Sequence, residues 1–183
     1  MDKTTQKLQS LQLDAHIPRD VALASIRHAL EVDLGYHFFE VDEARPWGAF
    51  YRIVDEEADR FLAEFFPGLD PMQARLGQSN LALSPKILVV YPEQRLSWQY
   101  HVYRAERWHF LTPGGYYRST TDEQGTMLSA QAGEDVQFET GERHRLVGDA
   151  HNYTLVAEIW QHTNSAHPSD EADIVRLADD YKR

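Results

Sequence analysis

The sequence predicts a mainly β protein, an antiparallel sandwich or barrel with helices before it, and two observations support this. Hydrophobic residues make up 42% of the 183 residues and aromatic residues 11%, which is enough for one packed domain. From residue 84 onward, short runs rich in β-branched and aromatic residues alternate with turns that contain Pro, Gly and Asp. Many short strands with evenly spaced turns are typical of antiparallel β folds.

Helices are expected in the first third of the chain and at its end. After a polar arm or weak helix over residues 1–16, Leu23, Ile26 and Leu30 fall at helical spacing and predict a helix over 18–34. A second apolar stripe predicts a helix over 55–66 that ends at Pro67-Gly68. A third helix is expected over 171–181, with Ser169 as its N-cap.

The strands follow from runs that lie between the turn signals. We expect them at residues 86–91, 95–102, 107–111, 116–120, 127–130, 136–138 and 152–159. The chain then divides into an N-terminal helical extension over 1–44 and a β domain over 45–183, with a helical insertion around 55–68.

Charge and composition exclude several classes of partner. A net charge of −11 argues against nucleic acid and against an anionic membrane surface. There is no cysteine, so disulfides are impossible and any metal ligands must be His, carboxylate or amide groups. The first residues lack an apolar signal core, and no apolar run reaches membrane-spanning length, so we expect a cytoplasmic protein.

Four polar residues could meet around one metal ion. Gln99 and His101 alternate on one predicted strand and therefore share a face, and Glu106 returns after the next turn. His144 follows the turn at Thr140-Gly141 and can arrive from another strand pair. Such ligands suit one divalent ion (Zn, Fe, Mn, Ni or Co), although a Gln-x-His pair alone is commonly two surface residues.

The same residues carry a resemblance to the cupins. Gln99-x-His101-x4-Glu106 resembles the first half of the cupin signature, with Gln in place of the first His, and Glu93 stands where that half begins with Gly. Gly133-x5-Glu139-x-Gly141-x2-His144 resembles the second half, with Glu139 in place of Pro.

One cupin branch fits better, the type II mannose-6-phosphate isomerase family, which uses the Gln variant of the ligand set. Five segments in the same order carry this resemblance, which covers about residues 45–183: Arg45-Pro46-Trp47-Gly48, Arg95-Leu96-Ser97, Arg104-Ala105-Glu106, Gly141-Glu142-Arg143-His144-Arg145-Leu146 and Asp173-Ile174-Val175-Arg176-Leu177. The resemblance implies a cupin barrel (double-stranded β-helix, jelly roll) with a short C-terminal helix, and a homodimer by analogy.

The implied activity is metal-dependent aldose–ketose isomerisation of a phosphorylated sugar through an enediolate. Mannose 6-phosphate or a related hexose or heptose phosphate is the expected partner, and a divalent ion would stabilise the developing oxyanion. The resemblance implies Gln99, His101, Glu106 and His144 as metal ligands.

Cations near these strands are expected to bind the phosphate and to assist catalysis. The expected substrate-binding residues are Arg95, Ser97, Arg145 and Arg183, and the catalytic candidates are Lys86, Arg104, Glu106 and Arg176. Plainer interpretations exist: Lys86 as an edge-strand lysine, Arg104 as a solvated turn residue, and Arg176 and Arg183, seven residues apart, as charges of the C-terminal helix. A metal-bound carboxylate is also a weakened base, so Glu106 fits a ligand role better than a base role.

Departures from the family motif leave the substrate open. Arg107 stands where the isomerase motif usually has His, and Val102-Tyr103 stand where family members often have further histidines. Two other functions compete: a non-catalytic module that binds a sugar or nucleotide sugar, and a metal-dependent cupin oxygenase. The arginines around the site argue against the oxygenase.

Overall fold

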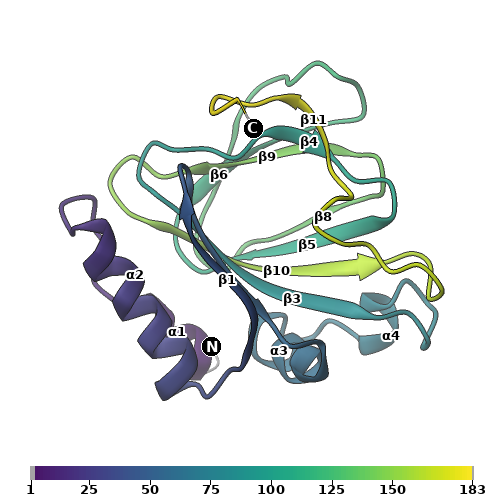
Figure 1. Cartoon of the computed structure of the whole chain (residues 1–183), viewed down its shortest axis with the longest axis horizontal. Helices are drawn as coiled ribbons and strands as arrows, with labels where there is room; N and C mark the ends of the chain where they lie inside the picture. Colours follow the sequence, from purple (N-terminus) through teal and green to yellow (C-terminus); the bar gives the residue numbers. More distant parts are fainter. Residues whose placement is uncertain (1–2, 183) are drawn as a thin grey trace.

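Two antiparallel sheets face each other in the computed structural model, which describes residues 3–182 (Figure 1). The six-stranded sheet has the order β1 (Phe38–Arg45), β2 (Gly48–Ile53), β3 (Leu83–Val90), β10 (Thr154–His162), β5 (Arg104–Phe110) and β8 (Asp135–Phe138). The five-stranded sheet has the order β11 (Val175–Ala178), β4 (Trp98–Tyr100), β9 (Arg143–Gly148), β6 (Gly114–Ser119) and β7 (Leu128–Ala130).

The central strands β3 and β10 are buried on both faces, because helices cover the outer face of the six-stranded sheet. On β3, Ile87 and Val89 pack toward the helices, while Leu88 and Val90 point between the sheets. This is the alternation that a pleated strand imposes. On β10 the inward positions include Glu158, a charged residue in a strand that is otherwise largely apolar.

The helical layer comes from the N-terminal region and from the insertion after β2 (Figure 1). Its elements are α1 (Lys3–Gln9), α2 (Arg19–His28), the π-turn η1 (Ala29–Asp33), the 3-10 turn η2 (Asp55–Glu57), α3 (Ala58–Phe65) and α4 (Pro71–Ala74). The predicted helices over 18–34 and 55–66 are therefore confirmed. Among residues 3–182, no helix is long and apolar enough to cross a membrane.

Two links move the chain between the sheets, and they carry the site. The link from β4 to β5 contains His101, and the turn from β8 to β9 contains Gly141, whose φ of 79° lies in the left-handed region that favours glycine. The backbone N–H of Gly141 donates to the carbonyl of His101 (2.8 Å), so the two links are joined. Residues from both sheets are thereby brought to one end of the space between them.

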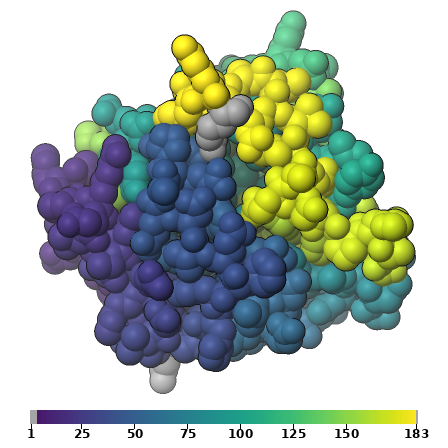
Figure 2. Space-filling view, in the orientation of Figure 1, coloured from purple at the N-terminus to yellow at the C-terminus, as the bar shows by residue number. Residues whose placement is uncertain are grey.

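The predicted C-terminal helix over 171–181 is wrong, because residues 175–178 form β11 instead. This strand pairs with β4, where Val175 stands opposite Tyr100 and Arg176 opposite Gln99. The preceding Asp173 accepts hydrogen bonds from the backbone N–H groups of Val102 and Tyr103 (2.8 and 3.0 Å). Pairing with β4 therefore outweighs the helix-favouring composition of this segment. Figure 2 shows the C-terminal segment lying over one face of the molecule, beside the blue residues of β1 and β2.

Strands β1, β2 and β9 are not among the predicted strands. Since β1 pairs with β2, the sheet begins at Phe38, ahead of the expected domain start at residue 45. Gly48 opens β2 where it passes close to β3: a Cβ on this residue would lie 1.8 Å from the carbonyl oxygen of Val89. Close backbone approach therefore explains the glycine of the Arg45-Pro46-Trp47-Gly48 segment.

Candidate metal centre and adjoining cavity

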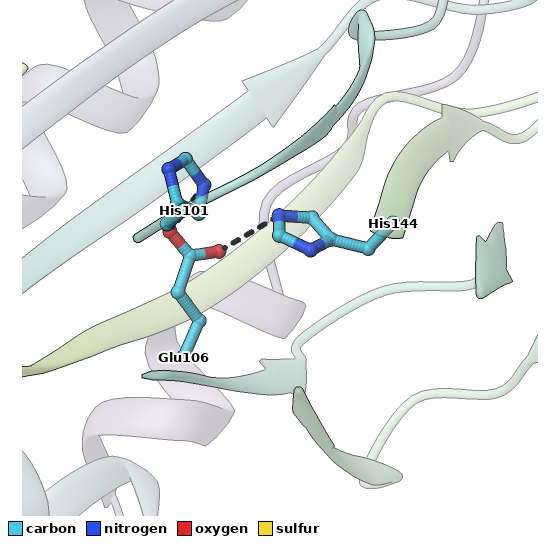
Figure 3. A group of neighbouring side chains, drawn as sticks. All are labelled: His101, Glu106 and His144. Carbon is cyan, nitrogen blue, oxygen red and sulfur yellow. Dashed lines mark ion pairs between the residues drawn. The ribbon is translucent and has the colours of Figure 1, made fainter. Parts of the chain in front are cut away.

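Three of the four predicted metal ligands converge in the protein interior (Figure 3). His101 Nε2 lies 3.0 Å from Glu106 Oε1, and His144 Nε2 lies 3.3 Å from Glu106 Oε2. All three side chains are buried, and their donor atoms lie within 4.8 Å of one another. Ligand atoms that share one ion at about 2.1 Å stand about 3 to 3.5 Å apart, so the spacing fits a single metal ion.

Hydrogen bonds fix both imidazoles in the form that a metal requires. His101 Nδ1 donates to the carbonyl of Asp173, and His144 Nδ1 donates to the carbonyl of Glu142 (3.0 Å). Each Nε2 is therefore left as a lone pair directed at the Glu106 carboxylate. Among residues 3–182, His144 Nε2 is buried without a hydrogen-bond partner. A cation bound between these atoms would accept the Nε2 lone pairs and offset their repulsion with the negatively charged carboxylate.

Gln99 completes the set from β4. It stands opposite His144 on β9, and its Nε2 lies 3.4 Å from His101 Nε2. Ser97 Oγ donates to Gln99 Oε1 (2.5 Å). Metal ligation by the amide oxygen requires the amide to turn over, and the Ser97 hydroxyl can then accept from the amide nitrogen. Ser97 therefore orients the amide group, and it also lines the adjoining cavity, where the expected substrate contact stays a prediction.

Arg104 secures the carboxylate of this cluster. Its Nε donates to Glu106 Oε1 (2.8 Å), and its Nη1 donates to Ser169 Oγ (2.8 Å) and to the carbonyl of Asp170 (2.9 Å). Nη2 also lies 3.3 Å from His101 Nε2, and the guanidinium stacks 3.7 Å from the Trp160 ring. Arg104 is buried, so the interpretation as a solvated turn residue is wrong.

The electrostatics of the cluster favour ligand protonation states. Burial lowers the pKa of His101, which keeps its imidazole neutral. Burial acts to raise the pKa of Glu106, but its interactions with His101, Arg104 and His144 outweigh burial, and that pKa lies well below its ordinary value. A neutral imidazole and an ionised carboxylate are the forms that bind metal.

A cavity of about 70 Å³ adjoins the cluster and reaches it at Gln99. Three cationic side chains, Arg45, Lys86 and Arg176, line this cavity. Lys86 is buried on the central strand β3, its Nζ pairs with Glu171 (2.6 Å), and it lies 4.1 Å from the Trp160 ring. The interpretation of Lys86 as an edge-strand lysine is therefore wrong.

Sequence reasoning missed Glu158, which also lines the cavity. Its two carboxylate oxygens accept hydrogen bonds from Trp108 Nε1 (2.9 Å) and Trp160 Nε1 (3.0 Å). Burial, together with the charge of Glu106, raises the pKa of Glu158 to about 8. The available signal was a lone Glu in a strand of apolar residues, Leu155-Val156-Ala157-Glu158-Ile159.

Two of the predicted substrate-binding arginines do not line the cavity. Arg95 and Arg145 both pair with Asp180, at 2.6 and 3.1 Å, and neither lines the cavity. Arg145 also donates to the carbonyl of Leu96 (2.6 Å). Arg183 lies outside the described residues. Because Arg176 lies in strand β11, the expectation that it shares a helix face with Arg183 is wrong, although Arg176 does line the cavity.

A family comparison now identifies the chain. The family described as mannose-6-phosphate isomerase C-terminal matches residues 77–179, more than half of the chain. The chain belongs to this family. Its match covers every predicted metal ligand, and with the two facing sheets it confirms the predicted cupin fold. No curated protein matches the sequence.

Solved structures resemble this family member at low sequence identity. The crystal structures of DMSP lyases RdDddP and RnDddQII align with 96% of this chain and 78% of that chain, at a TM-score of 0.50 and 12% identity. A cupin 2 conserved barrel domain protein from Salinispora arenicola CNS-205 aligns over 68% of this chain and 82% of its own, at 0.44 and 14%. An oxalate decarboxylase aligns over 79% and 31%, at 0.48 and 15%.

Proposed function

We propose that this protein is a metal-dependent aldose–ketose isomerase acting on a phosphorylated sugar. The observation that carries the proposal is the buried lone pair of His144 Nε2, which faces the Glu106 carboxylate beside a cavity lined by three cations. Family membership supports the reaction class.

The proposed ligands are His101, Glu106 and His144, with Gln99 as the fourth. A divalent cation bound there would act as a Lewis acid that polarises the sugar carbonyl. Arg104 touches Glu106 and not the cavity lining, so we assign it a positioning role. Glu106 then serves as a ligand rather than as the base, because a bound cation lowers its proton affinity.

The proposed phosphate-binding groups are the cations that line the cavity. Arg45 and Arg176 can donate to phosphate oxygens bidentately, and Lys86 adds a compact charge. Trp47 also lines this space, and within the described part of the chain its indole N–H is buried without a partner. That donor suits a sugar hydroxyl. Arg95 and Arg145 do not line the cavity and are not part of this proposal.

Substrate entry requires the C-terminal segment to move. A cavity of about 70 Å³ is small beside the roughly 300 Å³ or more of ordinary ligand sites. Glu171 and Ile174, from the segment before β11, line it, and the Lys86–Glu171 ion pair (2.6 Å) ties this segment to β3. Opening this segment would enlarge the site, and a substrate phosphate would replace the Glu171 carboxylate at Lys86.

The test is a panel of phosphorylated aldoses and ketoses incubated with metal-loaded protein in deuterated water and followed by NMR. We expect one aldose–ketose pair, mannose 6-phosphate or a related hexose or heptose phosphate, to equilibrate with deuterium entering at carbon two. A chelator should abolish exchange, and added metal should restore it. Metal-loaded protein that exchanges no substrate, and binds a sugar equally well with chelator present, would instead identify a binding module.

A further inference from the structure

We propose that Glu158 is a catalytic residue of this site, the group that carries a proton between the two reacting carbons of the sugar. This inference rests on the proposed isomerase function and adds the missing base. The buried carboxylate that the metal cluster does not use is the observation that prompts it.

Glu158 lies in one row with two other residues that line the cavity. Glu158 stands opposite Lys86 on β3 and opposite Trp108 on β5, in one row across three strands. Cross-strand neighbours in a row project to the same side of a sheet. All three line the cavity, which also reaches Gln99 of the metal cluster. The carboxylate and the proposed metal position thus border the same space.

Two hydrogen bonds orient the Glu158 carboxylate. Each oxygen of Glu158 accepts one indole N–H, from Trp108 and from Trp160. Two rigid donors hold the carboxylate in place and leave a further lone pair on each oxygen. A carboxylate fixed in this way is ready to take a proton from a bound molecule without reorganising.

Burial of the Glu158 carboxylate costs the protein stability. Glu158 is 4% exposed, and among residues 3–182 no cationic group lies within 4.0 Å of its carboxylate, because Lys86 Nζ pairs with Glu171 instead. Burying a carboxylate without a partner charge is unfavourable, and an apolar residue would suit this position on β10 better. Its raised pKa, to about 8, reflects this cost. Buried groups held at a cost in a cavity are candidates for function.

The proton balance of the reaction assigns separate roles to the two inward carboxylates. Glu106 is a proposed ligand, and a bound cation lowers its proton affinity, whereas Glu158 is buried beside the cavity and outside the ligand set, so its ionised form is the stronger base. The C2–H bond breaks, its proton passes to Glu158, and its electron pair forms the enediolate double bond. The proton then returns to C1 as a new C–H bond forms. The hydroxyl proton moves from O2 to O1 of the enediolate, so all protons and electron pairs stay within the reaction and no oxidant or reductant is needed.

The second carboxylate at the cavity, Glu171, fits this role less well. Its side chain is 42% exposed, and it lies on the segment that must move for substrate to enter. Its carboxylate is also engaged by Lys86 Nζ at 2.6 Å. Glu158, on a central strand, keeps its place whether that segment is open or closed.

The experiment compares Glu158→Gln, Glu158→Asp and the exposed control Glu123→Gln with wild-type protein, all loaded with the same metal. The readouts are kcat, solvent deuterium entry at carbon two, bound metal, and affinity for a phosphorylated sugar alcohol, which has no carbonyl to react. For Glu158→Gln we expect kcat to fall by about 10² to 10⁴-fold and deuterium entry to fall with it. Metal content and sugar-alcohol affinity should stay within about twofold of wild type.

Glu158→Asp keeps both acceptor oxygens for the two indoles and moves them back by one methylene. It should fold, recover part of the lost turnover and remain at least tenfold below wild type, which gives an answer even if Glu158→Gln does not fold. Wild-type turnover in a folded Glu158→Gln or Glu158→Asp variant would overturn the inference alone. Wild-type protein that isomerises no phosphosugar would overturn the proposed function and this inference together.

Discussion

Lys86 and Glu158 stand directly opposite each other on β3 and β10, and both point between the sheets without forming an ion pair with each other. Lys86 pairs with Glu171 from the C-terminal segment, and Glu158 is held by two tryptophans. The interior of the barrel therefore holds an oriented carboxylate and an ammonium beside the cavity that also reaches Gln99 of the predicted metal cluster.

The metal-free protein should become less stable as the pH rises from 4.5 to about 8, because Glu158 titrates at different pH values in the unfolded and folded chain. Its pKa is about 8 in the folded protein against an ordinary 4.5, because of burial and the charge of Glu106. Between these values the unfolded chain releases the proton and the folded chain keeps it, so the free energy of unfolding falls as pH rises. One such proton changes this energy by about 1.4 kcal/mol per pH unit at most.

Urea unfolding of wild type and Glu158→Gln at several pH values between 5 and 8 measures this effect. The lowered pKa of buried His101 acts in the opposite sense, but both proteins share it. The free energy of unfolding of wild type minus that of the variant should therefore decrease toward pH 8. A difference that stays constant over this range would show that Glu158 is already ionised in the folded protein.

Asp173 should support metal binding without being a ligand. Its carboxylate accepts from Val102 N, Tyr103 N and Ser169 Oγ, while its carbonyl accepts from His101 Nδ1. Asp173→Ala should release this segment and weaken metal affinity by about 10 to 100-fold, the usual effect of losing a group that orients a ligand. Titration with a divalent metal followed by calorimetry checks this.

The matched control lies on the same segment. The Asp170 carboxylate accepts from Ala172 N and is exposed, so Asp170→Ala should leave metal affinity near wild type. Equal affinities for the two variants would show that the Asp173 side chain does not position His101.

Arg104→Lys should destabilise the protein although it keeps the charge. The guanidinium donates hydrogen bonds to Glu106, Ser169 and the Asp170 carbonyl at once. A lysine ammonium cannot reach all of these acceptors from one point. Leaving the buried Glu106 poorly paired should cost about 3 to 5 kcal/mol in unfolding free energy.

Chemical denaturation with Arg27→Lys as control tests this. Arg27 forms an exposed pair with Glu31 at 3.6 Å, so its replacement should cost no more than about 1 kcal/mol. Comparable losses of unfolding free energy in the two variants would argue against a special role for the Arg104 guanidinium.

Local patterns in the sequence predicted much of the fold. Leu23, Ile26 and Leu30 lie at helical spacing, and the predicted helix forms because its apolar face covers the six-stranded sheet. The same local logic failed at residues 171–181, where Asp173 and the pairing of β11 with β4 decide the conformation. Such long-range pairings leave no periodic signal in the segment itself.

The metal ligands could be predicted from the sequence, whereas the residues that line the cavity could be predicted only in part. Gln99, His101, Glu106 and His144 occur in a motif, so spacing and resemblance together could find them. Whether a given arginine faces the cavity depends on which sheet face and which acid it meets: Arg145 is engaged by Asp180, whereas Arg176 borders the cavity. Glu158 belongs to none of the motifs quoted above. Its burial opposite Lys86 is visible only in the structure.

Metal content is the most direct test of the central claim, that His101, Glu106 and His144 hold one divalent ion. Elemental analysis of purified or reconstituted protein should find about one first-row metal ion per chain. Neither His101→Ala nor His144→Ala should retain it, while the exposed control His151→Ala should match wild type. Wild-type protein that binds no divalent metal, or a folded His144→Ala variant that binds it with unchanged affinity, would contradict the account.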